Sequence, residues 1–119
     1  MDTNSDRKYN LDKRTFTFAQ RIKDFIDKLP GKLTNIEIGK QLIRSAGSVG
    51  ANYIEADEAL SRKDFIMRIK ICKKEAKESR YWLQLSEPRT EERRLKSQLI
   101  DESTQLVKIC VTIIKNSNI

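Results

Sequence analysis

Apolar residues recur at steps of three and four residues along almost the whole chain, and this spacing limits the folds open to it. It places apolar side chains on one face of an α-helix, whereas a strand needs them at alternate positions. Two of the polar breaks carry proline, at Leu29-Pro30-Gly31 and Glu87-Pro88, where helices are expected to end. The pattern predicts helices at about residues 15–29, 35–60, 62–86 and 91–115. They form one domain, residues 13–116, after a polar tail of residues 1–12 that we expect to fray.

Each predicted helix has its own stripe of apolar or small residues. The first stripe consists of Phe16, Ala19, Ile22, Phe25, Ile26 and Leu29. The second consists of Ile38, Leu42, Ser45, Val49, Tyr53, Ala56 and Leu60. The third consists of Phe65, Ile69, Cys72, Ala76, Ser79 and Leu83, and the fourth of Leu95, Leu99, Glu102, Leu106, Ile109 and Ile113. The steps in the last three are close to a heptad, which favours helices that cross at small angles.

Three predicted helices begin with capping signals. Thr34-Asn35-Ile36-Glu37 has the pattern of a capping box, in which the Thr hydroxyl and the Glu carboxylate each accept an otherwise unpaired backbone N–H. Ser61 precedes Asp64 in the same way, and Thr90 precedes two acidic residues. Because the connections between helices span only a few residues, neighbouring helices must run antiparallel. The sequence therefore predicts an all-α fold, an antiparallel up-down-up-down four-helix bundle.

The composition excludes several kinds of site. The chain has no His and only 2 Cys, so it lacks a Ser-His-Asp or Cys-His catalytic unit and the usual zinc sites. Cys72 and Cys110 lie in apolar stripes and are expected to be buried thiols in a reducing cytoplasm. Neither a secretory signal nor a membrane-spanning apolar segment is expected. We predict a cytoplasmic protein with no membrane contact, no cofactor and no metal.

One arrangement of carboxylates leaves a metal enzyme open as a distant alternative. Some helical bundles hold two metal ions on inward-facing carboxylates that accompany Glu-x-x-His motifs. Here the motifs lack His, and the carboxylates that could converge are Glu55, Glu58, Glu75, Glu78 and Glu102. Pairing of Glu55 and Glu58 with basic residues of the third helix is the simpler expectation.

Positive charge is unevenly distributed along the chain, whose formal net charge is +7. Residues 34–60 hold 2 Lys or Arg and 4 Asp or Glu, whereas residues 61–87 hold 8 and 4. A phosphate backbone can match a row of cations on a rigid helix. The residues that we expect to form this row, on one outer face of the third helix, are Lys63, Lys70, Lys74, Lys77 and Arg80. An ordinary solvated helix face is the alternative.

The second helix contains an unusual run of small residues over positions 44–52, including two glycines. A glycine inside a helix costs about 1 kcal/mol relative to alanine, so close helix packing is expected to offset it. A phosphate-binding loop is excluded because the run lacks the Gly-x-x-x-x-Gly-Lys pattern. The residues in and beside the run that we assign to helix packing or to an interface are Arg44, Gly47, Gly50, Asn52, Tyr53 and Glu55.

Tyr81 and Trp82 are adjacent, so they cannot both face one core, and one of them should be half exposed. Aromatic residues of this kind are common at subunit interfaces, although stacking on a nucleic-acid base is also open. With Phe18 and Tyr53, they suggest an apolar surplus that another copy of the chain covers.

Three segments of the chain carry a resemblance to known proteins. They are Gln41-Leu42-Ile43-Arg44-Ser45-Ala46-Gly47-Ser48-Val49-Gly50-Ala51-Asn52-Tyr53-Ile54-Glu55-Ala56, then Ala59-Leu60-Ser61-Arg62-Lys63-Asp64-Phe65, and Ile71-Cys72-Lys73-Lys74-Glu75-Ala76-Lys77-Glu78-Ser79-Arg80-Tyr81-Trp82-Leu83. They resemble the four helix bundle protein family, also called the 23S rRNA intervening-sequence protein or S23 family. The first predicted helix is also similar, and the resemblance spans about residues 16–115.

This resemblance implies an antiparallel bundle that assembles into a ring-like homopentamer. A related protein, the accessory variability determinant of diversity-generating retroelements, is a basic pentamer that binds nucleic acid and partners a reverse transcriptase. The present chain lacks long basic tails, so only nucleic-acid binding is carried over. We therefore expect a non-enzymatic homo-oligomer that binds RNA or DNA through the basic face of its third helix. The alternative is a protein–protein adaptor or scaffold with an unidentified protein partner and no nucleic-acid role.

Overall fold

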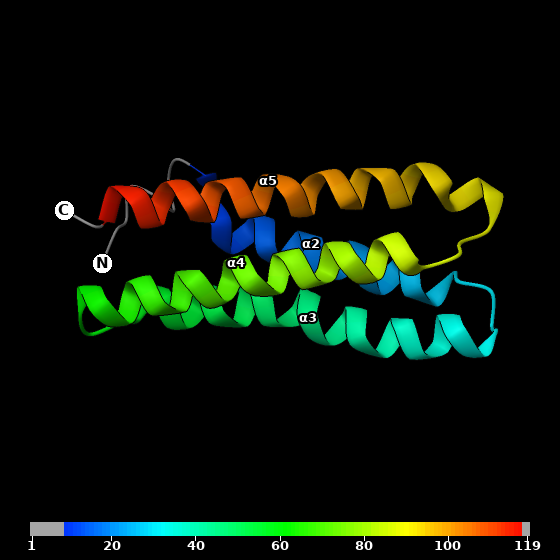
Figure 1. Cartoon of the computed structure of the whole chain (residues 1–119), viewed down its shortest axis with the longest axis horizontal. Coiled ribbons are helices and arrows are strands. Elements are labelled where there is room, and N and C mark those ends of the chain that lie inside the picture. Colours follow the sequence, from blue (N-terminus) through cyan, green and yellow to red (C-terminus); the bar gives the residue numbers. More distant parts are fainter. Residues whose placement is uncertain (1–8, 118–119) are drawn as a thin grey trace.

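The computed structural model describes residues 9–117 and confirms an all-helical bundle. Four long helices follow one another, α2 (Leu11–Asp27), α3 (Leu33–Asp57), α4 (Arg62–Leu85) and α5 (Arg93–Ser117), with a short 3-10 helix η1 (Thr90–Glu92) before the last. They run up and down along a body of 47 × 22 × 19 Å (Figure 1). No helix in the described part of the chain is long and apolar enough to cross a bilayer.

The four helices pack unequally. The α3–α4 contact is the most extensive, followed by α4–α5 and α2–α3, whereas α2 and α5 touch little. Polar side chains bridge that last pair. Arg14 Nε and Nη2 donate to the two carboxylate oxygens of Glu102, each at 2.8 Å, and Arg21 Nη2 donates to Gln98 Oε1 at 2.7 Å. Glu102, expected in the apolar stripe of the last helix, therefore lies at the polar edge of the bundle.

Apolar side chains from all four helices form one core. The largest fully buried members are Phe18, Phe25, Leu11, Ile22, Leu42, Ile69, Leu83, Leu99 and Leu106. Cys72 and Cys110 are buried among them, as predicted. Burial of this continuous interior supplies the main stabilisation of the fold.

The first predicted helix was placed in the wrong register. Helix α2 begins at Leu11 rather than Thr15, and its buried residues are Leu11, Thr15, Phe18, Ile22 and Phe25. Phe16 is 64% exposed, whereas Phe18 is 1% exposed. Leu11, Phe18 and Phe25 are seven residues apart, so they share one face once the earlier start is known. The predicted tail was thus too long at its C-terminal end, and its residues 1–8 lie outside the described part of the chain.

The predicted capping box of α3 is wrong. The helix begins at Leu33 after the N-cap Lys32, and no side chain caps it. Asn35 instead points back into the interior, where its Nδ2 donates to Pro30 O at 3.1 Å and to Glu87 O at 3.0 Å. At its other end α3 stops at Asp57, which leaves Leu60 96% exposed rather than in the stripe.

Helix α4 begins as predicted, because the backbone N–H of Asp64 donates to Ser61 Oγ at 3.0 Å. Helix α5 begins at Arg93. Thr90, predicted to cap this helix, lies in the preceding 3-10 helix η1. The ends of α4 and α5 meet at this turn, where Lys96 Nζ donates to Ser86 O at 2.8 Å.

Candidate nucleic-acid interface

The outer face of α4, which we define as Lys63, Met67, Lys70, Lys74, Lys77, Tyr81 and Leu85, lies opposite its buried residues. Its four lysines are exposed, as the predicted row requires. None of them makes an ion pair with any residue between positions 9 and 117. Their charges are therefore available to an anion from outside the protomer.

Arg80 does not belong to this face. It is half-buried, and its Nη1 donates to Thr104 Oγ1 of α5 at 3.2 Å. On a helix of 3.6 residues per turn, Arg80 lies beside Lys73 on the flank toward α5, whereas Lys77 lies at the edge of the outer face. The predicted row of five cations is therefore four lysines on the outer face and one arginine that ties α4 to α5.

Apolar side chains are interspersed with these lysines. Met67, Tyr81 and Leu85 are all exposed large hydrophobic residues, and Tyr81 is 54% exposed. The rings of Tyr81 and Trp82 meet edge to face, with centroids 5.0 Å apart and an interplanar angle of 75°. Trp82 is half-buried, so the prediction that one of the pair is half exposed is confirmed.

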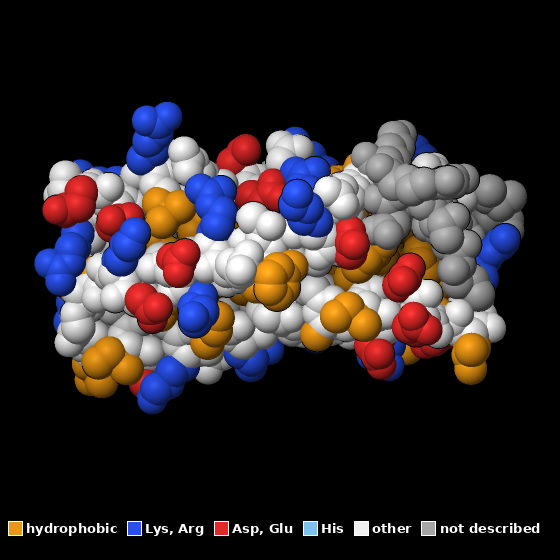
Figure 2. Space-filling model, turned by 180° about the vertical axis from the view of Figure 1, so that it is seen from behind, with side chains coloured by type: hydrophobic (Ala, Val, Ile, Leu, Met, Phe, Trp, Pro, Cys, Tyr) orange, Lys and Arg blue, Asp and Glu red, His pale blue; other side chains and the backbone are white. Residues whose placement is uncertain are grey.

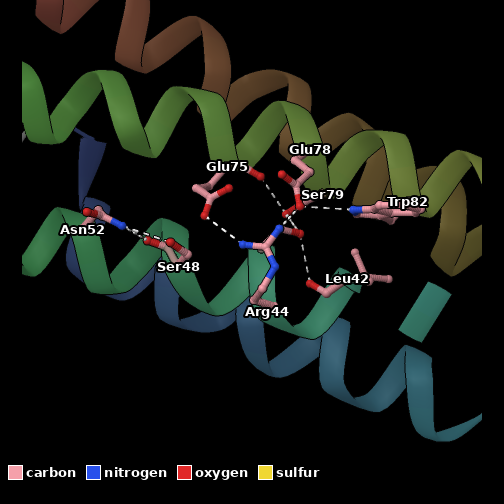
Figure 3. A network of polar contacts seen from close by, with 9 residues as sticks. Leu42, Arg44, Ser48, Asn52, Glu75, Glu78, Ser79 and Trp82 are labelled. Carbon is pink, nitrogen blue, oxygen red and sulfur yellow. Dashed lines mark hydrogen bonds and ion pairs between the residues drawn. The ribbon is translucent and has the colours of Figure 1, made fainter. Parts of the chain in front are cut away.

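Glu75 and Glu78 of α4 are engaged on a different side, toward α3 (Figure 3). Arg44 Nη1 lies 3.3 Å from Glu75 Oε2, and its Nη2 contacts Glu78. Glu78 also accepts a hydrogen bond from Trp82 Nε1 at 3.2 Å. Because Arg44 draws Glu75 and Glu78 to the α3–α4 contact, neither carboxylate neutralises the lysines of the outer face.

The five carboxylates considered for a metal site do not converge. Glu75 and Glu78 bind Arg44, Glu102 binds Arg14, and Glu55 and Glu58 are exposed. The expected pairing of Glu55 and Glu58 with α4 is wrong, because neither makes an ion pair with any described residue. Residues 9–117 contain no group of three or more side chains placed to hold a metal ion.

A hydrogen-bonded ladder continues along the α3–α4 contact. The Ser79 hydroxyl donates to Ser45 Oγ at 2.9 Å in the buried interior. Farther along, Asn52 Nδ2 donates to the carbonyl oxygen and the hydroxyl of Ser48, each at 2.9 Å (Figure 3). Arg68 Nη1 donates to Asn52 Oδ1 at 3.2 Å, while Arg68 Nε is buried with no partner in the described residues. The small polar residues thus let the two helices approach and fix their relative register.

The glycines of α3 have different neighbours. A Cβ atom at Gly50 would lie 3.3 Å from Thr15 Oγ1, and one at Gly39 would lie 3.1 Å from Ile26 Cγ2. Close packing against α2 therefore explains Gly50 as predicted, and also Gly39, which the sequence reasoning missed. A Cβ at Gly47 would have nothing within 4 Å. Packing within one protomer does not explain Gly47.

A second apolar surface lies on the other side of the molecule. Phe18 and Tyr53, expected to contribute to it, are buried instead. We define the α2–α3 face as Phe16, Ile36, Ile43, Gly47 and Ile54, all of which are exposed. Seen from behind, hydrophobic side chains reach the surface in several places between charged ones (Figure 2).

Comparison with known protein families shows a match over most of the chain. The family model of the 23S rRNA-intervening sequence protein matches residues 7–115. The chain belongs to the 23S rRNA-intervening sequence protein family. No curated protein gives a significant match.

A member of the S23 ribosomal protein family with unknown function, from Bacteroides thetaiotaomicron VPI-5482, is a similar solved structure. It is 33% identical, the match covers 90% of this chain and 96% of that chain, and the TM-score is 0.78. In this 23S rRNA-intervening sequence protein, the resembling segment 41–56 forms the middle of α3 and supplies Arg44, Ser45 and Asn52 to the α3–α4 contact. Helix packing accounts for Arg44, Ser45, Gly50 and Asn52 of this segment.

Proposed function

We propose that this 23S rRNA-intervening sequence protein is a non-enzymatic, cytoplasmic protein that self-associates and binds RNA or DNA through the outer face of α4. The observation that carries the proposal is the row of four exposed lysines without ion-pair partners among the described residues. Lysines on one side of a rigid helix bind phosphates without reading the base sequence. We therefore expect nucleic-acid binding with little sequence preference.

The local balance of charge supports this proposal. Residues 61–87 contain 8 Lys or Arg and 4 Asp or Glu. Three of those acids are already occupied, Glu75 and Glu78 by Arg44 and Glu87 by Lys32. The fourth, Asp64, lies in the first turn of α4 and makes no ion pair with a described residue. None of these acids is thus paired with an outer-face lysine, and the face attracts a polyanion more strongly than the net charge alone indicates.

Salt dependence of binding tests the proposal. The affinity for a structured RNA and for a DNA duplex is measured by filter binding at several salt concentrations. For each phosphate contact the log–log slope should be about −0.7 to −0.9. Lys70→Gln with Lys77→Gln should weaken binding and flatten the slope. Lys23→Gln with Lys28→Gln removes the same charge from α2 and its C-cap, and should do neither. Absence of salt-dependent binding to either nucleic acid would refute the proposal.

Self-association is supported by ten exposed large hydrophobic residues among positions 9–117, which include Phe16, Ile54 and Tyr81. Monomeric proteins rarely leave extended apolar patches in water. The family resemblance implies five copies in a ring, and we propose the same number for this chain. Light scattering should give a multiple of the 13.9 kDa chain mass, and a mass of one chain would contradict it.

A protein–protein adaptor is the second candidate function, and it is favoured by Met67, Tyr81 and Leu85 among the lysines. An acidic protein partner would satisfy both the charges and the apolar side chains of this face. Recovery of one defined partner, unchanged by nuclease treatment and lost in Tyr81→Ser, would select this function. Loss of the partner on nuclease treatment would exclude it.

A further inference from the structure

Two different apolar surfaces occur on each copy, the α2–α3 face and the apolar part of the α4 outer face, formed by Met67, Tyr81 and Leu85. If two copies met through one surface alone, the other would stay in water. A contact between the two different surfaces covers both of them in every copy of a closed ring. Two unlike surfaces on one chain therefore favour a head-to-tail contact over a two-fold dimer.

The apolar residues of the two surfaces lie at matching heights along the bundle. Near one end, Asn35 and Glu87 are hydrogen-bonded, which places the neighbouring Ile36 and Leu85 level with each other. Toward the other end, the hydrogen bond between Arg68 and Asn52 places the neighbouring Met67 and Ile54 level with each other. A rotation about an axis parallel to the bundle keeps these heights unchanged. The surface of one copy can therefore meet the other surface of its neighbour in register.

Beyond the apolar residues, the two surfaces also carry charges of opposite sign at equal heights along the bundle. Glu58 follows Ile54 by four residues, and Lys63 precedes Met67 by four, so each charge lies one turn beyond its apolar residue. Glu58 and Lys63 flank the α3–α4 turn and are both exposed. Neither makes an ion pair with a described residue of its own chain. In the in-register contact, Glu58 of one copy faces Lys63 of the next.

The same contact accounts for Gly47. This residue lies in the α2–α3 face, four residues after Ile43, and a side chain there would enter open space. The ion pairs of Arg44 with Glu75 and Glu78 place Gly47 near the height of Lys74. The missing side chain leaves room for the aliphatic part of that lysine from a neighbouring copy.

From these observations we infer that copies of this chain pack side by side and parallel, with the α2–α3 face of one on the apolar part of the α4 outer face of the next. Ile36 then contacts Leu85, Ile54 contacts Met67, and Glu58 pairs with Lys63. The inference rests on the self-association in the proposed function and adds its geometry. Lys63 and Lys74 then lie in the contact. Lys70 and Lys77, at the edge of the outer face nearer to α5, remain open to phosphates.

Disulfide trapping tests the arrangement. The double variant Ile54→Cys with Met67→Cys should give a ladder of covalently linked multimers on a non-reducing denaturing gel. The native Cys72 and Cys110 do not interfere because both are buried. Each single variant should give no ladder, and a mixture of the two single variants, refolded together, should give linked dimers. A 54–54 disulfide in the single variant would show a two-fold contact and overturn the inference.

Charge exchange tests the ion pair independently. Glu58→Lys alone and Lys63→Glu alone should each weaken self-association by about tenfold, because like charges then face each other. The double variant should recover it. Glu55→Lys, a matched control, makes the same charge change on another side of α3 and should associate normally. Equal effects of Glu55→Lys and Glu58→Lys would contradict the pairing.

The outcomes separate this inference from the proposed function. If light scattering shows that the wild-type chain is monomeric, both the proposed self-association and the inferred packing of neighbouring copies are refuted. If the wild type associates but the double cysteine variant gives no ladder, only the inferred packing is refuted. Salt-dependent binding of RNA or DNA is measured on the wild type and is decided separately from either result.

Discussion

The side chain of Asn35 forms a reciprocal pair of hydrogen bonds with the backbone of Glu87. Its Nδ2 donates to Glu87 O and its Oδ1 accepts from Glu87 N, both at 3.0 Å. Asn35 is 2% exposed. One side chain in the first turn of α3 thus holds the connection between α4 and α5, and with it joins the two helical hairpins at one end of the bundle.

Replacement of Asn35 by Ala should destabilise the protein by about 1–3 kcal/mol, because it removes the partners of two partly buried backbone groups of Glu87. Urea denaturation measures the loss. Thr34→Ala is the control, since Thr34 is exposed and caps nothing, and it should change the unfolding free energy by less than about 0.5 kcal/mol. A larger loss of unfolding free energy in Thr34→Ala than in Asn35→Ala would show that Thr34 caps α3 after all.

Alanine at Gly47 and at Gly50 should have opposite effects on the stability of one protomer. Gly47→Ala adds a methyl group in open space and should raise stability by about 1 kcal/mol through helix propensity. Gly50→Ala places a methyl group 3.3 Å from Thr15 Oγ1, which is fixed by its hydrogen bond to Leu11 O. It should lower stability by about 1 kcal/mol. Thermal denaturation of both variants under dilute conditions measures the difference, and equal shifts would contradict the distinction.

Phe16 and Phe18 should separate self-association from folding. Phe18→Ala removes a core ring and should cost about 3–5 kcal/mol of unfolding free energy. Phe16→Ala should leave the unfolding free energy of the dilute protein nearly unchanged and should weaken association. Urea denaturation measures the unfolding free energy of both variants, and light scattering measures their association. Normal association of Phe16→Ala would remove this residue from the interface.

The four helices and their order could be predicted because apolar periodicity and proline breaks are local signals. The placement of Phe16 and Phe18 could not be, because two aromatic residues two positions apart fit alternative helical stripes, and the choice depends on where α2 begins. Asn35 was misassigned for a related reason. Its partner Glu87 is far away in sequence, whereas the capping pattern is local.

The α4 lysine row was predicted correctly in its exposure, because a seven-residue repeat of charge fixes one face of a helix. Arg80 was misplaced because its side chain reaches Thr104 on another helix. The engagement of Glu75 and Glu78 by Arg44 could not be predicted from single-helix spacing either. Contacts between helices require the register of two elements, which the sequence of one element does not contain.

The two thiols should make stability depend on alkaline pH. Burial raises the pKa of Cys110 to about 12 and also raises the pKa of Cys72, mainly by desolvation of the thiolate. Unfolded thiols ionise near pH 8.5, so above that pH the unfolded state loses protons that the folded state keeps. Each thiol should then lower stability by up to about 1.4 kcal/mol per pH unit, until the pH reaches its folded pKa. The variant Cys72→Ala with Cys110→Ala should have a shallower decline between pH 8 and 10.5 in urea denaturation. Parallel declines would show that the thiols do not carry the effect.

Arg44 should stabilise the α3–α4 contact through Glu75, whose side chain is buried while Arg44 is half exposed. Arg44→Ala leaves that carboxylate without its cation, and the expected loss is about 1–3 kcal/mol, reduced from a fully buried pair by the exposure of the arginine. Lys40→Ala is the matched control, because Lys40 forms an exposed pair with Glu37 within the same helix and should cost less than about 0.5 kcal/mol. Adding Glu75→Gln and Glu78→Gln to Arg44→Ala should recover part of the loss, since neutral amides are less costly to bury than unpaired carboxylates. Urea denaturation of the wild type and the three variants at one salt concentration measures these differences. If Arg44→Ala were no worse than Lys40→Ala, the ion pairs of Arg44 would not contribute to the stability of the α3–α4 contact.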